Sequence, residues 1–273
     1  MNSAAVAAIQ LSSAADREVN LAAAGRLLAE AAGAGAVLAA LPENFSFMGA
    51  RDVDKLRLAE TDGAGPIQDF LAETAQKLKL WIVAGTVPLA VSGDPGRVYA
   101  ACLVYGADGR RAARYDKIHL FDVEVPGGER YRESASIAAG ALQPVTVDTP
   151  AGRLGLSVCY DLRFPELYRA LAAQGAELLC VPAAFTARTG AVHWEALLRS
   201  RAIENQCYLL APAQYGTHAG GRGTWGHSLV IDPWGEVLAQ QDTGDGVVLA
   251  QVDPVRLEQV RRTFPALAHR RMV

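Results

Sequence analysis

Residues 154–167 read LGLSVCYDLRFPEL. The apolar run at 154–158 predicts a buried strand, and Pro165 is typical of the first position of a helix. We therefore expect Cys159 at the end of the strand, in the first turn of the helix that Pro165 opens. Backbone N–H groups and the positive end of a helix dipole at such a turn favour a thiolate and bind an oxyanion. The stretch predicts an α/β unit whose strand-to-helix turn carries a nucleophile.

The other three cysteines have a different setting. Cys102, Cys180 and Cys207 lie in apolar segments with a strand-like pattern. Free cysteines in such segments are usually small buried hydrophobic residues, so we expect these three to pack in the core. No paired cysteine spacing occurs in the sequence, which suits a reducing compartment.

A catalytic cysteine needs a base nearby in space. The five histidines are scattered and show no local Cys-His signature, although the fold can still bring one of them to the thiol; they are His119, His193, His218, His227 and His269. Glu43 is a second candidate, because it ends the apolar run 38–42 and burial there would raise its carboxyl pKa and make it a competent base. Lys117 follows a predicted strand, where a fixed ammonium would stabilise a tetrahedral oxyanion.

Taken together, these stretches resemble the nitrilase superfamily of carbon–nitrogen hydrolases. The matching motifs are LPEN at 41–44, YDKIHLF at 115–121 and SVCYDLRFPE at 157–166, followed by HWE at 193–195, RSRAIENQ at 199–206 and WGHS at 225–228. The resemblance covers nearly the whole chain. It implies a Glu-Lys-Cys triad and a four-layer α-β-β-α sandwich.

The resemblance also implies a role for each residue of the triad. Glu43 would be the general base, Cys159 the nucleophile and Lys117 the stabiliser of the oxyanion, with the backbone N–H of Tyr160 completing the oxyanion hole. The chemistry would be a two-step acyl transfer through a thioester. Hydrolysis of a nitrile or of an N-carbamoyl group would use the same residues, so both reactions stay open.

A second glutamate is expected to orient the lysine and the substrate. By the same resemblance this residue is Glu133, because the following Ser134 continues the family pattern. Glu129 lies close by in the sequence and is the alternative.

Within the superfamily the chain is most similar to the Nit-type branch, which contains amidases of deaminated glutathione and omega-amidases. This similarity implies that Arg163, Phe185 and Thr189 hold the carboxylate of a 2-oxo acid. A guanidinium one helical turn after the nucleophile can also grip a carboxylate bidentately on physical grounds, whereas an ion pair with Asp161 or Glu166 is the alternative for Arg163. The resemblance favours deaminated glutathione as the substrate, with 2-oxoglutaramate or 2-oxosuccinamate, the substrates of an omega-amidase, as the alternative.

Composition narrows the class of protein. The chain has 273 residues, of which 51% are hydrophobic and 20% charged, enough for one large core. A net charge of −3 provides no excess of positive charge that would indicate binding to nucleic acid or to a membrane surface. No signal peptide or membrane-spanning run is recognisable, and no His-x-x-x-His or Cys-x-x-Cys pair suggests zinc. We therefore expect a cytoplasmic enzyme without a metal or cofactor, and a catalytically inactive interaction protein is the remaining alternative.

Two internal similarities indicate how the chain is organised. Residues 28–45 and 168–185 align as helix-strand units, and residues 104–109 and 230–235 align as hairpin turns. They suggest two related halves, each with a sheet covered by helices, within a single domain at 1–273. The apolar tail from Phe264 to the end is of the kind that packs against a partner subunit in the family, which predicts a homodimer.

Overall fold

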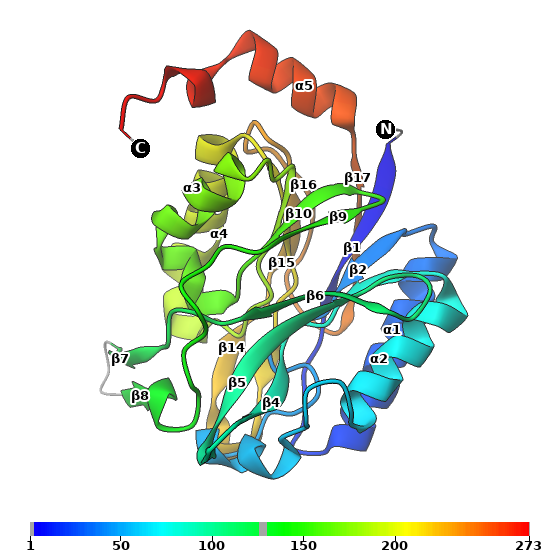
Figure 1. The fold of residues 1–273 in the computed structure, drawn as a ribbon, viewed down its shortest axis with the longest axis vertical. Helices are drawn as coiled ribbons and strands as arrows, with labels where there is room; N and C mark the ends of the chain where they lie inside the picture. Colours follow the sequence, from blue (N-terminus) through cyan, green and yellow to red (C-terminus); the bar gives the residue numbers. More distant parts are fainter. Residues whose placement is uncertain (1–2, 126–129, 273) are drawn as a thin grey trace.

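Two large β-sheets packed face to face form the centre of the computed structural model (Figure 1), which describes residues 3–125 and 130–272. The first sheet has the order β17-β1-β2-β3-β5-β4, with β6 paired to β5. Its strands are β1 (Ala4–Gln10), β2 (Leu38–Ala40), β3 (Trp81–Val83), β4 (Val87–Val91), β5 (Asp94–Tyr105), β6 (Arg111–Asp116) and β17 (Gly246–Val252). The second has the order β16-β15-β12-β11-β10-β9. Its strands are β9 (Thr146–Thr149), β10 (Gly152–Leu156), β11 (Leu178–Cys180), β12 (Tyr208–Ala211), β15 (Ser228–Ile231) and β16 (Val237–Gln241).

Helices cover the outer face of each sheet. In Figure 1, α1 and α2 lie on one side of the molecule and α3 and α4 on the other. The helices are α1 (Arg17–Gly33), α2 (Pro66–Leu78), α3 (Pro165–Ala173), α4 (Ala187–Asn205) and α5 (Pro254–Thr263), with the short 3₁₀ turns η1 (Asp52–Leu58), η2 (Glu133–Ala135), η3 (Cys159–Arg163), η4 (Ala219–Gly221) and η5 (Ala266–His269). This is the predicted α-β-β-α order of layers.

The alternation of side chains along β1 explains the layering. Val6 and Ala8 belong to the core that contains residues of both sheets, whereas Ala7 and Ile9 belong to the core between the first sheet and its helices. Successive side chains of a strand point to opposite faces, and β1 is apolar at every position from Ala4 to Ile9, so both of its faces must be covered. β1 therefore requires a sheet on one face and helices on the other.

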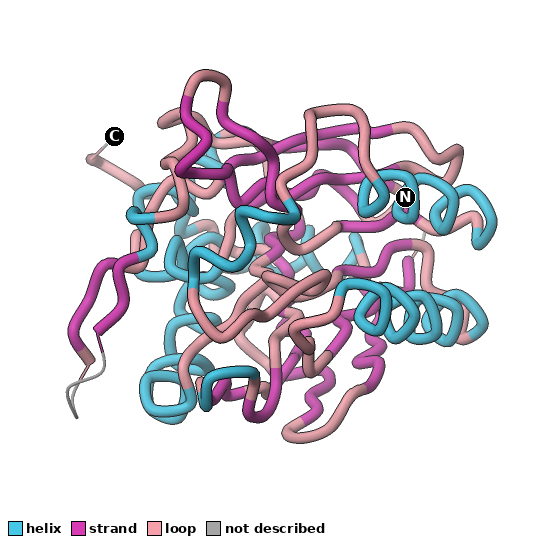
Figure 2. The backbone as a smooth tube through the Cα atoms, turned by 90° about the horizontal axis from the view of Figure 1, so that it is seen from below, coloured by secondary structure: helices cyan, strands magenta, loops and turns pink. Residues whose placement is uncertain are grey.

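Two hairpins lie outside the sheets. One joins β7 (Asp122–Glu124) to β8 (Arg130–Arg132), and it projects from the rest of the backbone in Figure 2. The other joins β13 (Tyr215–Thr217) to β14 (Gly223–Trp225). In the described part of the chain, no helix combines the length and the apolar character needed to cross a membrane.

The internal similarities of the sequence correspond to equivalent structural units. α1 leads into β2 as α3 leads into β11, and the glycines before the two strands, Gly35 and Gly175, have φ values of +89° and +85°. The second pair of segments forms the β5–β6 and β15–β16 turns. β1, β2 and β3 run parallel, as do β10, β11 and β12, so the loops that follow β2, β10 and β11 meet at one end of the sandwich.

One position in this region requires glycine, because another segment of the backbone lies too close to it for a side chain. Gly85 has a φ of +55°, and a Cβ atom there would lie 1.9 Å from the Pro42 carbonyl oxygen, in the loop that holds Glu43. We expect Gly85→Ala to lower the free energy of unfolding by about 2–4 kcal/mol, measured by urea denaturation.

Gly93 provides a matched control. Its φ is +77°, but a Cβ atom there would have no neighbour within 4 Å. Gly93→Ala should therefore cost only about 1 kcal/mol, the strain of a positive φ. Equal losses for the two variants would show that the contact with Pro42 is unimportant.

Candidate active site

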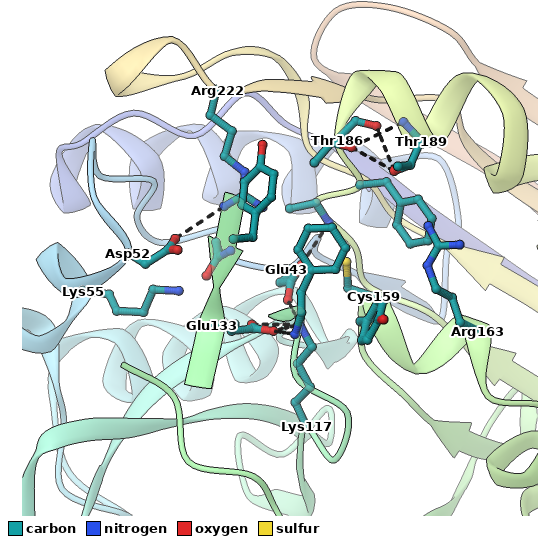
Figure 3. A pocket seen from close by; sticks show the side chains of 16 residues that line it. Glu43, Asp52, Lys55, Lys117, Glu133, Cys159, Arg163, Thr186, Thr189 and Arg222 are labelled. Atoms are coloured by element: carbon teal, nitrogen blue, oxygen red, sulfur yellow. Dashed lines mark hydrogen bonds and ion pairs between the residues drawn. The ribbon is translucent and has the colours of Figure 1, made fainter. Parts of the chain in front are cut away.

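A pocket of about 490 Å³ lies where the loops after β2, β6, β10 and β11 meet (Figure 3). The structure brings together at this pocket every residue that the sequence singled out for the site, apart from the alternative glutamate: Glu43, Lys117, Glu133, Cys159, Tyr160, Arg163, Phe185 and Thr189. Glu129 lies outside the described residues. No histidine is among the described residues that line the pocket, so the nearest base for the thiol is a carboxylate.

Cys159 lies in a strained turn. β10 ends at Leu156, and Cys159 begins the separate 3₁₀ turn η3 with a φ of +47°, before α3 starts at Pro165. The prediction that the thiol belongs to the first turn of the Pro165 helix was therefore wrong in detail. The Cys159 N–H donates to the Pro182 carbonyl at 2.9 Å, and 3₁₀ geometry gives the next N–H, that of Tyr160, no acceptor within the turn.

The carboxylate of Asp161 holds this turn in place. Asp161 is fully buried and accepts hydrogen bonds from the Val158 N–H at 2.8 Å and the Tyr115 hydroxyl at 2.6 Å. It also accepts from the His119 N–H at 3.1 Å and lies 2.7 Å from His119 Nδ1. Sequence reasoning missed this role, because Tyr115 and His119 lie in one segment that is more than 40 residues from Asp161 in the chain.

A buried ion cluster lies beside the thiol. The Lys117 ammonium is 1% exposed and donates to Glu43 Oε1 at 2.8 Å and to both carboxylate oxygens of Glu133 at 2.8 and 2.9 Å. Glu133 Oε2 also accepts from the Phe121 N–H at 2.6 Å. A buried ammonium with three carboxylate contacts is held in one position.

Glu43 links this cluster to the nucleophile and to the second sheet. Its Oε2 accepts from the Ala184 N–H at 3.0 Å, in the loop after β11, and its carboxylate lies beside the Cys159 thiol, so that each group shifts the pKa of the other. The Gln214 side chain donates to the Glu43 carbonyl at 3.0 Å and fixes the backbone. Glu43 is thus the carboxylate adjacent to the thiol, which is the position that a general base requires.

The pKa values in the cluster follow from burial and charge. Burial raises the pKa of Glu43, but the Lys117 charge and hydrogen bonds outweigh it, so the Glu43 pKa lies below its usual value of 4.5. The prediction that burial would raise this pKa was wrong, because it omitted the lysine. Burial alone would lower the pKa of Lys117, yet Glu133 and Glu43 raise it well above its usual value.

The thiol itself is protonated in the resting site. Burial and the Glu43 charge raise the pKa of Cys159 well above its usual value, against the opposing effect of Lys117. The expectation of a thiolate at the turn was therefore wrong, because desolvation and the adjacent carboxylate prevail. Cys102, Cys180 and Cys207 are also buried, as predicted, and lie outside the pocket.

Arg163 faces the pocket without a carboxylate partner. Its guanidinium carbon lies 5.3 Å from the centroid of the Phe185 ring and 5.7 Å from that of Tyr160, and its Nη1 is 3.3 Å from His193 Nδ1. It forms no ion pair with any carboxylate in the part of the chain that the structure describes. The alternative of an ion pair with Asp161 or Glu166 is therefore wrong.

Thr189 and Phe185 complete this end of the pocket in different ways. The Thr189 hydroxyl lies 2.8 Å from that of Thr186, which caps α4 by accepting from the Thr189 N–H. Phe185 packs against Trp194 with ring centroids 4.9 Å apart. Phe185 thus supports Arg163, whereas the Thr189 hydroxyl is already engaged in the helix cap.

Sequence reasoning missed several pocket residues. They are Asp52, Lys55, Tyr131, Ala184, Thr186 and Arg222, whereas Asn44 and Phe121 were noted only as parts of motifs. The glycine-rich segment at 218–223 is the one available signal, and it marks the loop of Arg222. No group of three or more potential metal-ligating side chains occurs among the residues that the structure describes.

Comparison with known proteins agrees with this site. A sequence profile of carbon–nitrogen hydrolases matches residues 5–262. The chain belongs to the carbon–nitrogen hydrolase family. This membership confirms the predicted family and makes the protein a hydrolase of carbon–nitrogen bonds other than peptide bonds.

Individual relatives of this carbon–nitrogen hydrolase are similar over most of its length. Deaminated glutathione amidase from Synechocystis sp. is 47% identical over 265 residues, which cover 97% of each chain. The chloroplastic omega-amidase of Arabidopsis thaliana is 40% identical over 96% of this chain and 71% of that protein. Among solved structures, the Caenorhabditis elegans NitFhit protein has a TM-score of 0.93 at 39% identity, covering 99% of this chain and 66% of that one. This similarity confirms the predicted fold class.

The ion cluster predicts a large effect of removing its cation. Lys117→Met leaves Glu43 and Glu133 without their counter-ion, and we expect it to lower the free energy of unfolding at pH 7 by about 3–5 kcal/mol. Folding lowers the pKa of Glu43, so its contribution to stability is present above pH 4.5 and is lost as the pH falls through the lower, folded value. The difference between variant and wild type should therefore shrink as the pH is lowered below 4.5.

Lys55→Met is the control for this measurement. Lys55 lines the same pocket but forms no ion pair with a described carboxylate, so its loss should cost less than about 1 kcal/mol. A loss for Lys117→Met that is as small, or that does not change with pH, would contradict the description of Lys117 as the counter-ion of the two glutamates.

Proposed function

We propose that this carbon–nitrogen hydrolase is a cysteine-dependent amidase that cleaves the amide bond of deaminated glutathione. The observation that carries the proposal is the Cys159 thiol, which lies beside Glu43 in a pocket that is also lined by Lys117 and by Arg163, a cation without a carboxylate partner among the described residues. The similarity to amidases of deaminated glutathione supports the choice of substrate.

In the first half of the proposed reaction, Glu43 takes the thiol proton as Cys159 Sγ attacks the amide carbonyl carbon. The oxyanion forms between the Lys117 ammonium and the Tyr160 N–H, which stabilise its charge in a site that excludes water. The tetrahedral species collapses when Glu43 returns the proton to the amine leaving group. The products of this half are the thioester and the dipeptide amine.

In the second half, a water molecule enters the place of the amine. Glu43 removes a proton from this water as the oxygen attacks the thioester carbonyl, and the same two donors hold the second oxyanion. Collapse breaks the carbon–sulfur bond, and the proton on Glu43 returns to the sulfur. Glu133 accepts from the Lys117 ammonium through both carboxylate oxygens and keeps it in position.

The substrate's 2-oxo acid end is placed by Arg163. The guanidinium has no carboxylate partner among the described residues, and the ring of Phe185 lies beneath it. A free guanidinium binds a carboxylate through two parallel hydrogen bonds. An omega-amidase reaction on 2-oxoglutaramate would use the same end of the pocket, and the Arabidopsis relative supports it as the second candidate.

Two further features belong to this proposal. We infer a cytoplasmic enzyme, which is supported by four free cysteines. We also infer a homodimer. Two apolar side chains support it: Trp234 is 54% exposed and Phe264 is 56% exposed, and their rings are in edge-to-face contact.

The first test compares substrates directly. Purified enzyme should release 2-oxoglutarate from deaminated glutathione with a kcat/KM at least tenfold above that for 2-oxoglutaramate, which is about 1.4 kcal/mol of transition-state discrimination. Cys159→Ala should abolish both activities, whereas Cys102→Ala, which removes a buried thiol outside the pocket, should retain them. The reverse preference would identify an omega-amidase, and activity on neither compound would refute the proposed substrate class.

The role of Arg163 gives a second test. Arg163→Lys keeps the charge but loses the bidentate fork, so we expect KM for 2-oxoglutaramate to rise about 10- to 100-fold and KM for its neutral methyl ester to change far less. Arg188→Lys, an exposed substitution outside the pocket, serves as the control. Equal losses on the charged and neutral substrates would assign Arg163 a structural role.

A further inference from the structure

The pocket carries positive charge on both sides of the nucleophile. Figure 3 shows Arg163 on one side of Cys159, and Lys55 and Arg222 with Asp52 on the other side. The proposed mechanism uses Arg163 but assigns no role to Lys55 or Arg222. These two residues come from different parts of the chain, η1 and the segment between η4 and β14.

Lys55 is a cation without a structural partner. Its side chain is partly buried, and it forms no ion pair within residues 3–125 and 130–272. Two smaller hollows of about 290 and 250 Å³ also have Lys55 and Asn44 in their walls, and Cys159 lines neither of them. An ammonium group placed in this way is available to a ligand.

Arg222 is only partly satisfied. Its Nη1 lies 3.5 Å from Asp52 Oδ1, which is longer than the usual distance of a charge-assisted hydrogen bond, and its guanidinium carbon lies 5.1 Å from the centroid of the Tyr131 ring. Its Nε is buried and has no hydrogen-bond acceptor. A buried N–H without an acceptor is unfavourable unless a ligand supplies one.

The charges on this side of the pocket do not cancel. Lys55 and Arg222 contribute two positive charges, and Asp52 contributes one negative charge. One positive charge is therefore left over, at the end of the pocket opposite Arg163.

We propose that Lys55 and Arg222 bind a carboxylate on the amine leaving group, so that the enzyme selects amides that are anionic at both ends. This inference rests on the proposed function, because it places the scissile amide at Cys159 and the 2-oxo acid at Arg163. Deaminated glutathione carries its second carboxylate on the glycine of its dipeptide, on the far side of the scissile amide. A primary amide has no carboxylate on its leaving group and so cannot bind to Lys55 and Arg222 in this way.

The test removes one carboxylate from the substrate and one cation from the protein. The substrates are deaminated glutathione and its analogue with the glycine carboxylate converted to a carboxamide, and release of 2-oxoglutarate reports cleavage of both. Wild-type enzyme should show a kcat/KM at least tenfold higher for the dianion. In Lys55→Met and in Arg222→Gln this ratio should fall at least fivefold, and in the double variant it should approach one.

Lys77→Met, an exposed substitution in α2, is the matched control and should keep the wild-type ratio. Because the readout is a ratio between two substrates, partial loss of folded enzyme in a variant does not affect it. Equal kcat/KM values for the two substrates in the wild type would overturn the subsite while leaving the proposed function intact. A wild-type ratio that persists in both single variants and in the double variant would also overturn it.

Failure of the proposed function is recognised separately. If wild-type enzyme cleaves neither compound, the subsite is tested by calorimetric binding of the two compounds to the Cys159→Ala variant. Binding of the dianion at least tenfold tighter than that of the carboxamide supports the subsite, and equal binding overturns it.

Discussion

The ammonium of Lys117, enclosed between two carboxylates, is the interaction on which the arrangement of the site depends. A buried charge is tolerated only when its partners are in place. Lys117 follows β6, Glu43 follows β2, and Glu133 follows the β7–β8 hairpin, so the ion cluster joins three loops. Glu43 reaches further, because its second oxygen accepts from the Ala184 N–H beyond β11 in the other sheet. The position of the base relative to the thiol is therefore determined by contacts with both sheets.

The balance of charge in the cluster determines the state of the nucleophile. Two carboxylates around one ammonium leave a net negative charge beside Cys159, and this charge adds to burial in keeping the thiol protonated. The same charge would repel an anionic substrate if it stood alone. The cations on the two sides of the pocket, Arg163 on one and Lys55 with Arg222 on the other, offset this repulsion. The charge of the ion cluster and the charges of these cations therefore act together on a charged ligand in the pocket.

Some parts of the site were predictable from the sequence because they depend on local pattern. Glu43 and Cys159 each follow an apolar strand-like run, and in an α/β fold the loops after parallel strands meet at one end of the sheets. Lys117 follows β6, which carries charged residues and is antiparallel to β5, so its position at the same end was indicated by the motif and not by this rule. The sign of the Glu43 pKa shift was not predictable in this way, since it depends on a cation that is distant in the chain. Lys55 and Arg222 were missed for a similar reason, because each lies in irregular structure and only the fold brings them to one pocket. The extent of the domain and the roles of the site residues stay predictions.

The turn at Cys159 shows how residues that never meet the substrate position the nucleophile. A φ of +47° costs roughly 1–2 kcal/mol for a residue with a side chain, so this conformation persists only if the surroundings impose it. The Cys159 N–H is held by the Pro182 carbonyl, and Asp161 holds the preceding N–H, that of Val158. With these two groups fixed, the thiol is directed toward Glu43 and the Tyr160 N–H follows as the next donor in the turn. Asp161 is in turn held by Tyr115, two residues before Lys117, so Cys159 and Lys117 are positioned through the same buried carboxylate.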